Sequence, residues 1–478
     1  MILPPKKKPK TPTFTLRKLP SEIDSILHES EEPPLPCLNL NAAGIDVGSR
    51  SHFVAVPADR DAQPVREFST FTPDLESLAD WLQECGVTTV AMESTGVYWI
   101  PLFELLDSRG FEVKLVNARH VKNVPGRKTD VVDCQWLQQL HTFGLLSGSF
   151  RPDDDICVLR AHMRQRDTLT RYASAHIQHM QKALNQMNIQ LHHVVSDVTG
   201  VTGMAIIKAI LGGERDPEKL AELRDRRCKN SVETIAKALQ GNWRDEHLFA
   251  LRQAVELFEV YQQKIRDCDL AIEQVLKAFE PQTDEPPPAP TRKHKVYRNT
   301  PDIDLHAHLF HLVGVDLSRI DGLNPHSVLK ILSEIGLDMD RWPTVKHFAA
   351  WLGLSPGNHV SGGKPVGKAS TTPSANRAAA TFRMAAQSLH GSQSALGGFL
   401  RRQKARLGAP KAITATAHKL ARIFYAMLKN KTAYDAPDAD YYENQYRKRV
   451  VANLKRRADN MGFDLVARSD QETVPASS

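Results

Sequence analysis

Residues 44–56 have the sequence Gly-Ile-Asp-Val-Gly-Ser-Arg-Ser-His-Phe-Val-Ala-Val. The first five residues predict a short apolar strand that ends in a turn at Gly48, and residues 52–56 predict a second strand that runs back. Two short strands separated by turn-forming residues are typical of a β-hairpin. The stretch therefore predicts the start of a domain that is built on a β-sheet.

The chain that follows this hairpin alternates between helical and extended patterns. Hydrophobic periodicity predicts helices around 75–82 and 98–106, and apolar runs predict buried strands at 87–92 and 112–116. The order hairpin, helix, strand, helix, strand is that of an α/β domain. We therefore expect a mixed sheet covered by helices over residues 43–150.

Four acidic residues are placed where such a sheet would bring them together. Asp46 lies in the first strand and Glu93 follows the strand at 87–92, so both can project into a crevice at the strand ends. Asp130 and Asp133 are three residues apart, which puts both on one face if their segment is helical. Four such carboxylates repel one another unless cations lie between them. Two Mg²⁺ ions would relieve that repulsion and suit chemistry at a phosphodiester.

Each of these acids also has an ordinary structural explanation. Asp46 is compatible with a turn residue, and Asp130 is compatible with a helix N-cap. Glu93 and Asp133 are compatible with solvated surface charges. The run at 44–49 also fits the phosphate loop of actin-like sugar kinases, whose fold is related.

Beyond Arg151 the pattern becomes helical. Two series of residues repeat at intervals of three and four, as in the packed seam of a coiled coil. The first series predicts one long unbroken helix and consists of Ile177, Met180, Leu184, Met187, Leu191, Val194 and Val198. The second series consists of Leu248, Leu251, Val255, Phe258, Gln262, Ile265, Cys268, Ile272, Val275 and Phe279. Residues 151–280 are therefore expected to form a helical coiled-coil arm, either an antiparallel pair or a self-association surface.

The proline-rich stretch at 281–300 predicts a stiff linker, because Pro286-Pro287-Pro288-Ala289-Pro290 favours an extended chain. The region after it, residues 301–435, is expected to be a mainly α-helical domain. Its apolar periodicity predicts helices at 327–335, 345–352, 375–389 and 409–428.

Composition limits the class of protein. The chain has 478 residues, which is enough for about three domains. Its net charge of +7 and sequence pI of about 9.0 favour polyanionic partners such as nucleic acid. The six cysteines show neither C-x-x-C pairs nor zinc spacing, so reduced thiols in a cytoplasmic protein are expected. No run of about 18 apolar residues exists to cross a membrane.

Both ends of the chain have biased composition. Residues 1–42 are basic and proline-rich without an apolar core, which predicts a disordered tail and not a secretory signal. Residues 436–478 are expected to form a basic C-terminal tail.

Four motifs in the N-terminal half carry a resemblance to a known family. They are Gly44-Ile45-Asp46-Val47-Gly48, Met92-Glu93-Ser94-Thr95-Gly96-Val97-Tyr98-Trp99, Val116-Asn117-Ala118-Arg119-His120-Val121-Lys122 and Gly126-Arg127-Lys128-Thr129-Asp130-Val131-Val132-Asp133. In this order they resemble the DEDD transposases of the insertion sequence 110 family, including its insertion sequence 1111 branch. The resemblance implies a RuvC-like domain of the RNase H type. It also implies that Asp46, Glu93, Asp130 and Asp133 bind Mg²⁺ and are catalytic.

The C-terminal half resembles the second domain of that family. The motifs are Ile320-Asp321-Gly322-Leu323, Phe348-Ala349-Ala350-Trp351-Leu352-Gly353-Leu354-Ser355-Pro356, Ser361-Gly362-Gly363-Lys364 and Ala417-His418-Lys419-Leu420-Ala421-Arg422. Family members use a serine from the Ser-Gly loop as the nucleophile, which implies Ser361. A hydroxyl in a glycine-flanked loop lets a phosphate approach closely. Several neighbouring hydroxyls meet the same chemical description, namely Ser355, Ser370, Thr371, Thr372 and Ser374.

Basic residues are candidates for contacts with nucleic acid. Seven of them lie near the predicted site or in a basic run: Lys128, Lys364, Lys368, Arg401, Arg402, Lys404 and Arg406. Such runs usually form solvated faces, but in a phosphodiester enzyme they are natural contacts to the phosphate backbone. We find no zinc finger or recognition helix that would select a DNA sequence. The family resemblance implies instead a structured guide RNA, encoded by the element, as a partner.

The sequence therefore predicts a Mg²⁺-dependent DNA transposase or recombinase. It is expected to be cytoplasmic and associated with the nucleoid, to bind no membrane, and to work as a homo-oligomer, a dimer or a tetramer. One alternative is a RuvC-like junction nuclease that uses water in place of Ser361. Another is a non-catalytic regulator that binds nucleic acid.

Overall fold

The computed structural model describes residues 36–117, 130–289, 299–357, 360–362, 364–365, 370–371, 375–435 and 441–466. The chain divides into two compact units, residues 1–151 and 152–478. The predicted disordered tail lies outside the described residues as far as residue 35. No helix among the described residues is both long and apolar enough to span a membrane.

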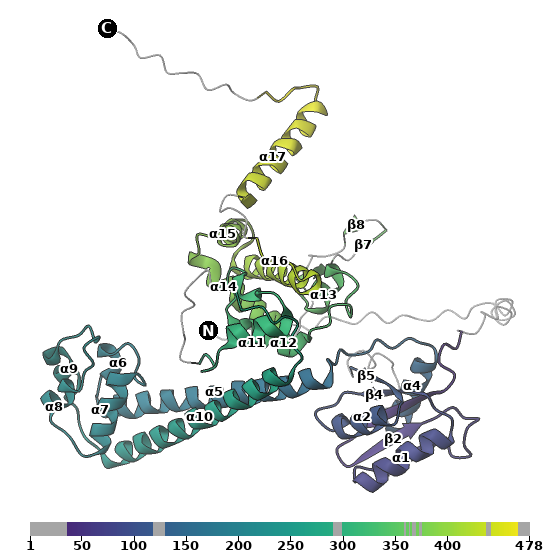
Figure 1. The fold of residues 1–478 in the computed structure, drawn as a ribbon, viewed down its shortest axis with the longest axis horizontal. Helices are drawn as coiled ribbons and strands as arrows, with labels where there is room; N and C mark the ends of the chain where they lie inside the picture. Colours follow the sequence, from purple (N-terminus) through teal and green to yellow (C-terminus); the bar gives the residue numbers. More distant parts are fainter. Residues whose placement is uncertain are drawn as a thin grey trace, which may run out of the picture. The chain divides into compact units, whose positions relative to one another are not determined.

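The first unit is built on one five-stranded sheet (Figure 1). Its strands are β1 (Ala42–Val47), β2 (Ser51–Ala55), β3 (Val65–Ser69), β4 (Thr89–Glu93) and β5 (Glu112–Val116). Their order is β3-β2-β1-β4-β5, with antiparallel pairing from β3 to β1 and parallel pairing from β1 to β5. This mixed sheet with helices fits the predicted α/β domain of the RNase H type.

Strand β3 is an addition to the predicted sheet. The alternation of apolar and charged residues around Arg66 and Glu67 gives no continuous apolar run, and none of its residues is fully buried. The strand pairs only with β2, at the edge of the sheet. Edge strands depend on a neighbour more than on their own hydrophobicity, which explains why the sequence pattern did not predict this one.

The two faces of the sheet have different neighbours. Three helices lie among the described residues of this unit, α1 (Thr72–Glu84), α2 (Trp99–Ser108) and α4 (Asp130–Thr142). Alternate residues of β1, namely Ala43, Ile45 and Val47, pack in one core with α1 and α2. The residues between them, Gly44 and Asp46, belong to the opposite face, where α4 packs.

The second unit begins with two long helices, α5 (Asp154–Gln186) and α10 (Asp245–Ala278). Arg166 pairs with Asp269, and farther along the helices the ring of His176 stacks on that of Tyr261. Residue numbers rise on one helix as they fall on the other, so the pair is antiparallel (Figure 1). The antiparallel arrangement was one of the two predicted alternatives. The knobs-into-holes packing of a coiled coil stays a prediction.

The prediction of one unbroken first helix is wrong. Helix α5 ends at Gln186, and Asn188 has a left-handed backbone with φ 56°. Asparagine is among the few residues that tolerate this conformation just after a helix, so it ends the helix here. Four short helices follow, α6 (Leu191–Val194), α7 (Val201–Leu211), α8 (Pro217–Glu222) and α9 (Val232–Ala238).

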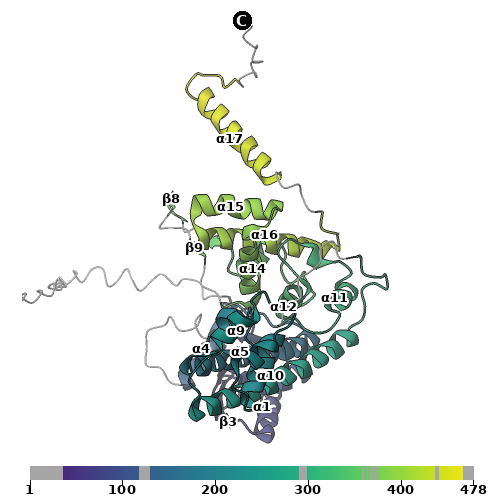
Figure 2. The ribbon, with the colours of Figure 1, turned by 90° about the vertical axis from the view of Figure 1, so that its left-hand side faces the viewer.

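The rest of the second unit is mainly helical, as predicted. Its helices are α11 (Leu305–Val313), the 3₁₀ helix η1 (Leu317–Arg319), α12 (Pro325–Ile335), α13 (Val345–Trp351), α14 (Arg377–Ser388), the 3₁₀ helix η2 (Leu389–Gly391), α15 (Ala395–Leu407), α16 (Ala409–Asn430) and α17 (Tyr441–Asp459). Helix α16 lies between α14 and α15 (Figure 2). The four helices predicted in this region are confirmed as α12, α13, α14 and α16. Helix α17 lies within the stretch predicted as a basic tail.

Helix α5 is tied to α12 by arginines. Arg160 donates to the carbonyl oxygens of Ser333 and Glu334, and Arg164 forms a bidentate pair with the Glu334 carboxylate at 2.7 and 3.0 Å. These cations lie at the C-terminal end of α12, where the helix dipole favours positive charge. Part of the predicted linker, 290–298, lies outside the described residues.

Candidate active site

Two of the four predicted acids lie side by side on neighbouring strands. Ile45 of β1 pairs with Met92 of β4 in parallel register, so the next residues along the two strands are Asp46 and Glu93. Residues at equal levels of parallel strands project from the same face. Both side chains are partly buried. The structure therefore brings these two carboxylates to one face at the carboxyl ends of β1 and β4.

Helix α4 packs closely on that face because β1 has a glycine there. A Cβ atom on Gly44 would lie 2.3 Å from the backbone nitrogen of Gln138 and 2.4 Å from the carbonyl oxygen of Cys134. Such distances are far inside van der Waals contact, so only glycine allows this approach. The close contact places the first turns of α4 beside the strand that carries Asp46.

A second contact fixes how α4 is aligned along β4. His141 Nε2 lies 2.8 Å from Thr89 Oγ1, and this hydroxyl donates its proton to the carbonyl oxygen of Glu112. From Thr89 to Glu93 the strand advances roughly 13 Å. From His141 back to Asp133 the helix spans roughly 12 Å. Asp133 thus lies at about the level of Glu93.

The electrostatics at Cys134 support this convergence of acids. The pKa of the Cys134 thiol is raised to about 12, mainly by burial, with the negative charges of Asp46 and Asp133 contributing. Both carboxylates are therefore close enough to Cys134 to act on it. Burial also lowers the pKa of His141 to about 4, so this side chain is neutral at pH 7.

Asp130 is the first residue of α4, one turn before Asp133. Its side chain lies outside the part of the chain that the structure describes, as does Lys128. Among the side chains that are described, no three of the His, Cys, Asp and Glu type lie so that they could hold a metal ion as a group. Three of the four predicted acids are nevertheless brought to one edge of the sheet. Carboxylate oxygens are the ligands that Mg²⁺ prefers, so this donor set fits a divalent ion.

Ser361 lies in the second unit, at the tip of a short hairpin. Strands β7 (Val360–Ser361) and β8 (Lys364–Pro365) pair, with Ser361 opposite Lys364. Gly362 has φ 56°, a conformation that glycine adopts without strain at such a turn. The Ser361 side chain is exposed.

The structure describes only some of the other candidate residues of this loop. Lys364 is described only as part of β8, and Lys368, Thr372 and Ser374 lie outside the described residues. A second short pair, β6 (Pro356–Gly357) and β9 (Ser370–Thr371), lies on either side of the hairpin in the sequence. Ser355 and Thr371 are partly buried, unlike Ser361.

The predicted basic run lies on α15, where its members have different roles. Arg401 donates to the carbonyl oxygens of His390 and Ser392, and Lys404 Nζ lies 3.0 Å from His390 Nε2. These two residues hold the turn before α15. Arg402 and Arg406 instead line a groove that faces α17. Lys419, which was not among the predicted site residues, and Arg449, which belongs to the predicted basic C-terminal tail, lie beside this groove.

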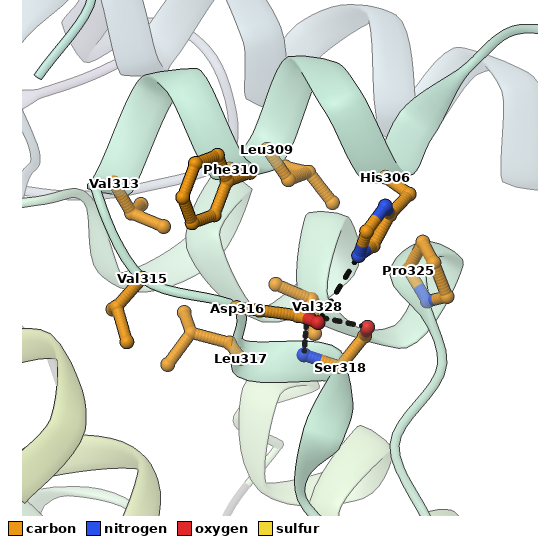
Figure 3. A pocket seen from close by; sticks show the side chains of 10 residues that line it. All are labelled: His306, Leu309, Phe310, Val313, Val315, Asp316, Leu317, Ser318, Pro325 and Val328. Carbon is orange, nitrogen blue, oxygen red and sulfur yellow. Dashed lines mark hydrogen bonds and ion pairs between the residues drawn. The ribbon is translucent and has the colours of Figure 1, made fainter. Parts of the chain in front are cut away.

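One other cluster of polar side chains joins a serine, an aspartate and a histidine (Figure 3). Asp316 accepts from the Ser318 hydroxyl at 2.6 Å and from its backbone nitrogen at 3.0 Å, and it lies 3.1 Å from His306 Nε2. The aspartate is the central member, so the histidine cannot take a proton from the serine as in a hydrolase triad. The enclosed space is only ≈ 10 Å³, about one water molecule. The cluster therefore caps η1 and is not a reaction site.

Comparison with known protein families gives two matches. Residues 43–189 match the DEDD family of IS110 elements, described as transposase, and residues 316–395 match the family described as transposase IS116/IS110/IS902. Neither match distinguishes the insertion sequence 1111 branch. No curated protein matches the chain. DEDD transposase domains use divalent metal ions, which agrees with the acids at the sheet edge. The chain belongs to the IS110 family of transposases.

Proposed function

We propose that this transposase cleaves and rejoins the DNA strands of an insertion sequence, with a Mg²⁺ site in the first unit and a serine nucleophile in the second. The metal site consists of Asp46, Glu93, Asp130 and Asp133, and the nucleophile is Ser361. The observation that carries the proposal is the meeting of Asp46, Glu93 and the first turns of α4 on one face of the sheet. Carboxylates gathered in this way repel one another, so the group binds a cation more strongly than a single carboxylate does.

When bound to these acids, two Mg²⁺ ions supply positive charge that stabilises a phosphodiester under attack. The protein's own part is to hold the acids still. Asp46 and Glu93 are held by two strands that pair with each other. Asp133 is held by α4, which packs closely on the sheet because residue 44 is glycine. Because the ligands are already in position, the entropy needed to assemble the site does not add to the activation free energy of the reaction.

Ser361 supports the second half of the proposal because it is exposed on a tight turn. In the cleavage step its Oγ forms a bond to the phosphorus while the bond from phosphorus to one deoxyribose oxygen breaks. The hydroxyl proton passes to water, and the departing oxygen takes up a proton to become a hydroxyl. Rejoining is the reverse step with the hydroxyl of another strand end, so no energy-rich cofactor is needed.

The choice of DNA sites belongs to the proposed guide RNA, because the chain offers no recognition helix that we can identify. We further propose a homo-oligomer, since strand exchange requires several DNA ends to be handled together. A location in the cytoplasm with the nucleoid follows from the same role.

The proposal is tested by strand cleavage on supercoiled DNA that carries the element's ends, with Mg²⁺ and the co-expressed flanking RNA. Wild type is compared with Ser361→Ala and Asp46→Ala, and Ser355→Ala serves as a matched loop control. We expect both site variants to lose cleavage and the control to keep it. If Ser361→Ala still cuts, the enzyme is a metal-dependent nuclease that uses water. If no protein cuts the DNA, and Asp46→Ala binds nucleic acid as well as the wild type does, the chain is a regulator without catalysis.

A further inference from the structure

The charges of the chain are strongly segregated. Residues 341–434 contain no aspartate or glutamate, whereas they contain fifteen lysines and arginines. The net charge of +7 for the whole chain therefore conceals a basic region set against an acidic remainder. Helices α14, α15 and α16 all come from this acid-free segment. A surface made from them has few internal carboxylates to neutralise its cations.

A groove of ≈ 500 Å³ lies between α15 and α17. Arg402 and Arg406, one helical turn apart, face it from α15, and Arg449 faces it from α17. Gln403 and Asn453 add amide groups, and none of the lining residues that the structure describes is acidic. Three guanidinium groups around one groove repel one another and favour an anion between them.

The position of α17 beside α15 is set by an aromatic contact. The ring centroids of Phe399 on α15 and Tyr442 on α17 are 5.7 Å apart. The ammonium group of Lys419 on α16 lies 4.8 Å from the first ring and 3.8 Å from the second. A cation held against two aromatic faces is a favourable contact, so it anchors the first turn of α17.

The pKa of Lys419 reflects the positive charge of this region. This pKa is lowered to about 8, mainly by burial, with the positive charges of Arg422, Arg449 and Arg402 contributing. The cations of the three helices therefore act on one another across the groove. A bound anion would relieve that repulsion.

We propose that the groove between α15 and α17 binds the phosphate backbone of duplex DNA and holds it without selecting its sequence. Duplex DNA is the occupant we infer because the family acts on DNA, and because arginine and amide groups without a base-reading element suit phosphates. Most of α15 and all of α17 lie after residue 395, where the second family match ends. The residues that line the groove therefore lie outside the matched residues 316–395. The inference rests on the proposed function for the choice of duplex DNA as the occupant.

The test measures binding of the full chain to a labelled duplex that lacks the element's ends, in EDTA, by fluorescence anisotropy over a series of salt concentrations. The variant Arg402→Gln, Arg406→Gln, Arg449→Gln removes the three groove cations. Each lost phosphate contact reduces the slope of log affinity against log salt by about 0.9, so we expect a decrease of about 2 to 3. At about 0.1 M salt the affinity is expected to fall more than tenfold.

The matched control removes three exposed lysines elsewhere in the second unit, with Lys182→Gln, Lys219→Gln and Lys237→Gln. It is expected to leave the salt slope close to that of the wild type. Tyr442→Ala, which keeps every groove cation, is expected to weaken binding because α17 loses its anchor. Equal slopes for the groove variant and the wild type, or equal losses in the groove variant and the control, would overturn the proposal.

A parallel arm uses a structured RNA with the same number of phosphates. If the groove variant loses RNA binding and keeps DNA binding, the occupant is RNA and the proposal is wrong. Because EDTA prevents cleavage, this result is independent of the Ser361→Ala and Asp46→Ala experiments. A negative result in the binding test therefore does not contradict the proposed cleavage chemistry, and a negative result in the cleavage test does not contradict DNA binding by the groove.

Discussion

The sheet edge of the first unit and one long segment of the second unit differ in their content of acidic residues. In the first, Asp46, Glu93 and Asp133 are gathered at one edge of a sheet. In the second, the segment that carries Ser361 has no acidic residue from 341 to 434. Carboxylates attract a metal ion but repel a phosphate directly, so acids suit a metal site and an acid-free surface suits the DNA backbone. The difference teaches that the two regions suit different partners, which agrees with the proposed metal site in the first and the proposed DNA contacts in the second.

The largest effect is expected from Asp46→Asn, which keeps the shape of the side chain and removes its charge. If the gathered acids hold the metal, DNA cleavage should fall by about 10³-fold or more, because the ion loses a ligand. The initial rate of cleavage in Mg²⁺ measures this. Glu67→Gln, on the edge strand β3, is a matched control that should cleave normally. A rate for Asp46→Asn within a few-fold of wild type would remove the functional contrast between the units.

The next largest effect is expected on stability, at a buried acidic residue of the second unit. Asp269 is buried and paired with Arg166, which also donates to the carbonyl oxygen of Asn299 at 3.0 Å. Arg166→Met leaves a buried carboxylate without its cation, so the free energy of unfolding should fall by about 3–5 kcal/mol. Urea denaturation measures the change. The double variant Arg166→Met, Asp269→Leu should recover most of the loss, and an undiminished loss would contradict the ion-pair explanation.

A smaller effect is expected at the contact that brings Asp133 to the sheet. Gly44→Ala places a Cβ against the backbone of α4, so the first unit should lose about 1–3 kcal/mol of stability. Metal-dependent cleavage should fall as well, since α4 is displaced. Gly391→Ala is the control, because a Cβ there meets no atom within 4 Å. Thermal unfolding and cleavage rate are both measured, and normal cleavage in Gly44→Ala would show that the position of α4 does not matter.

The smallest expected effect is a pH dependence of DNA affinity that arises from Lys419 in the basic segment. The pKa of Lys419 is lowered to about 8 by burial, with Arg402, Arg422 and Arg449 adding to the shift, and Tyr442 faces it from α17. As pH rises through 8 the ammonium group loses its charge, so DNA affinity should fall roughly three- to tenfold between pH 7 and 9. Lys419→Met should lack this step.

The same shift predicts the sign of a stability change. The folded chain gives up the Lys419 proton near pH 8, whereas an unfolded lysine keeps it to its usual value of 10.5. The unfolded state thus binds more protons between these values, and stability from this group rises with pH across that window. A fall in stability from pH 8 to 10 that Lys419→Met abolishes would contradict the assignment.

Much of the fold was predictable because it follows from local pattern. The apolar runs predicted β1, β2, β4 and β5, and the position of Asp46 and Glu93 on neighbouring strands followed from the order of elements. The end of α5 was not predicted, because Asn188 interrupts a series that continues in phase. The pairing of Arg166 with Asp269 joins residues 103 positions apart, and no local pattern reports such a contact.

The site was predictable in part for the same reason. The acids share short motifs, so the sequence indicated which residues matter, but only the contact at Gly44 explains how α4 reaches β1. The groove was missed because a basic run does not show which of its members hold a turn, as Arg401 does, and which face outward, as Arg406 does. The absence of acids from 341 to 434 was the signal that would have indicated it.

The central claim is that acids of one unit and a serine of the other act on the same phosphodiester. Its most direct test is to trap the covalent protein–DNA adduct on supercoiled DNA with Mg²⁺ and the flanking RNA, digest it, and identify the modified peptide by mass spectrometry. We predict DNA attached at Ser361 in the wild type and in Ser355→Ala, and no adduct in Asp46→Asn. Attachment at another residue, or an adduct that forms without Asp46, would contradict the account.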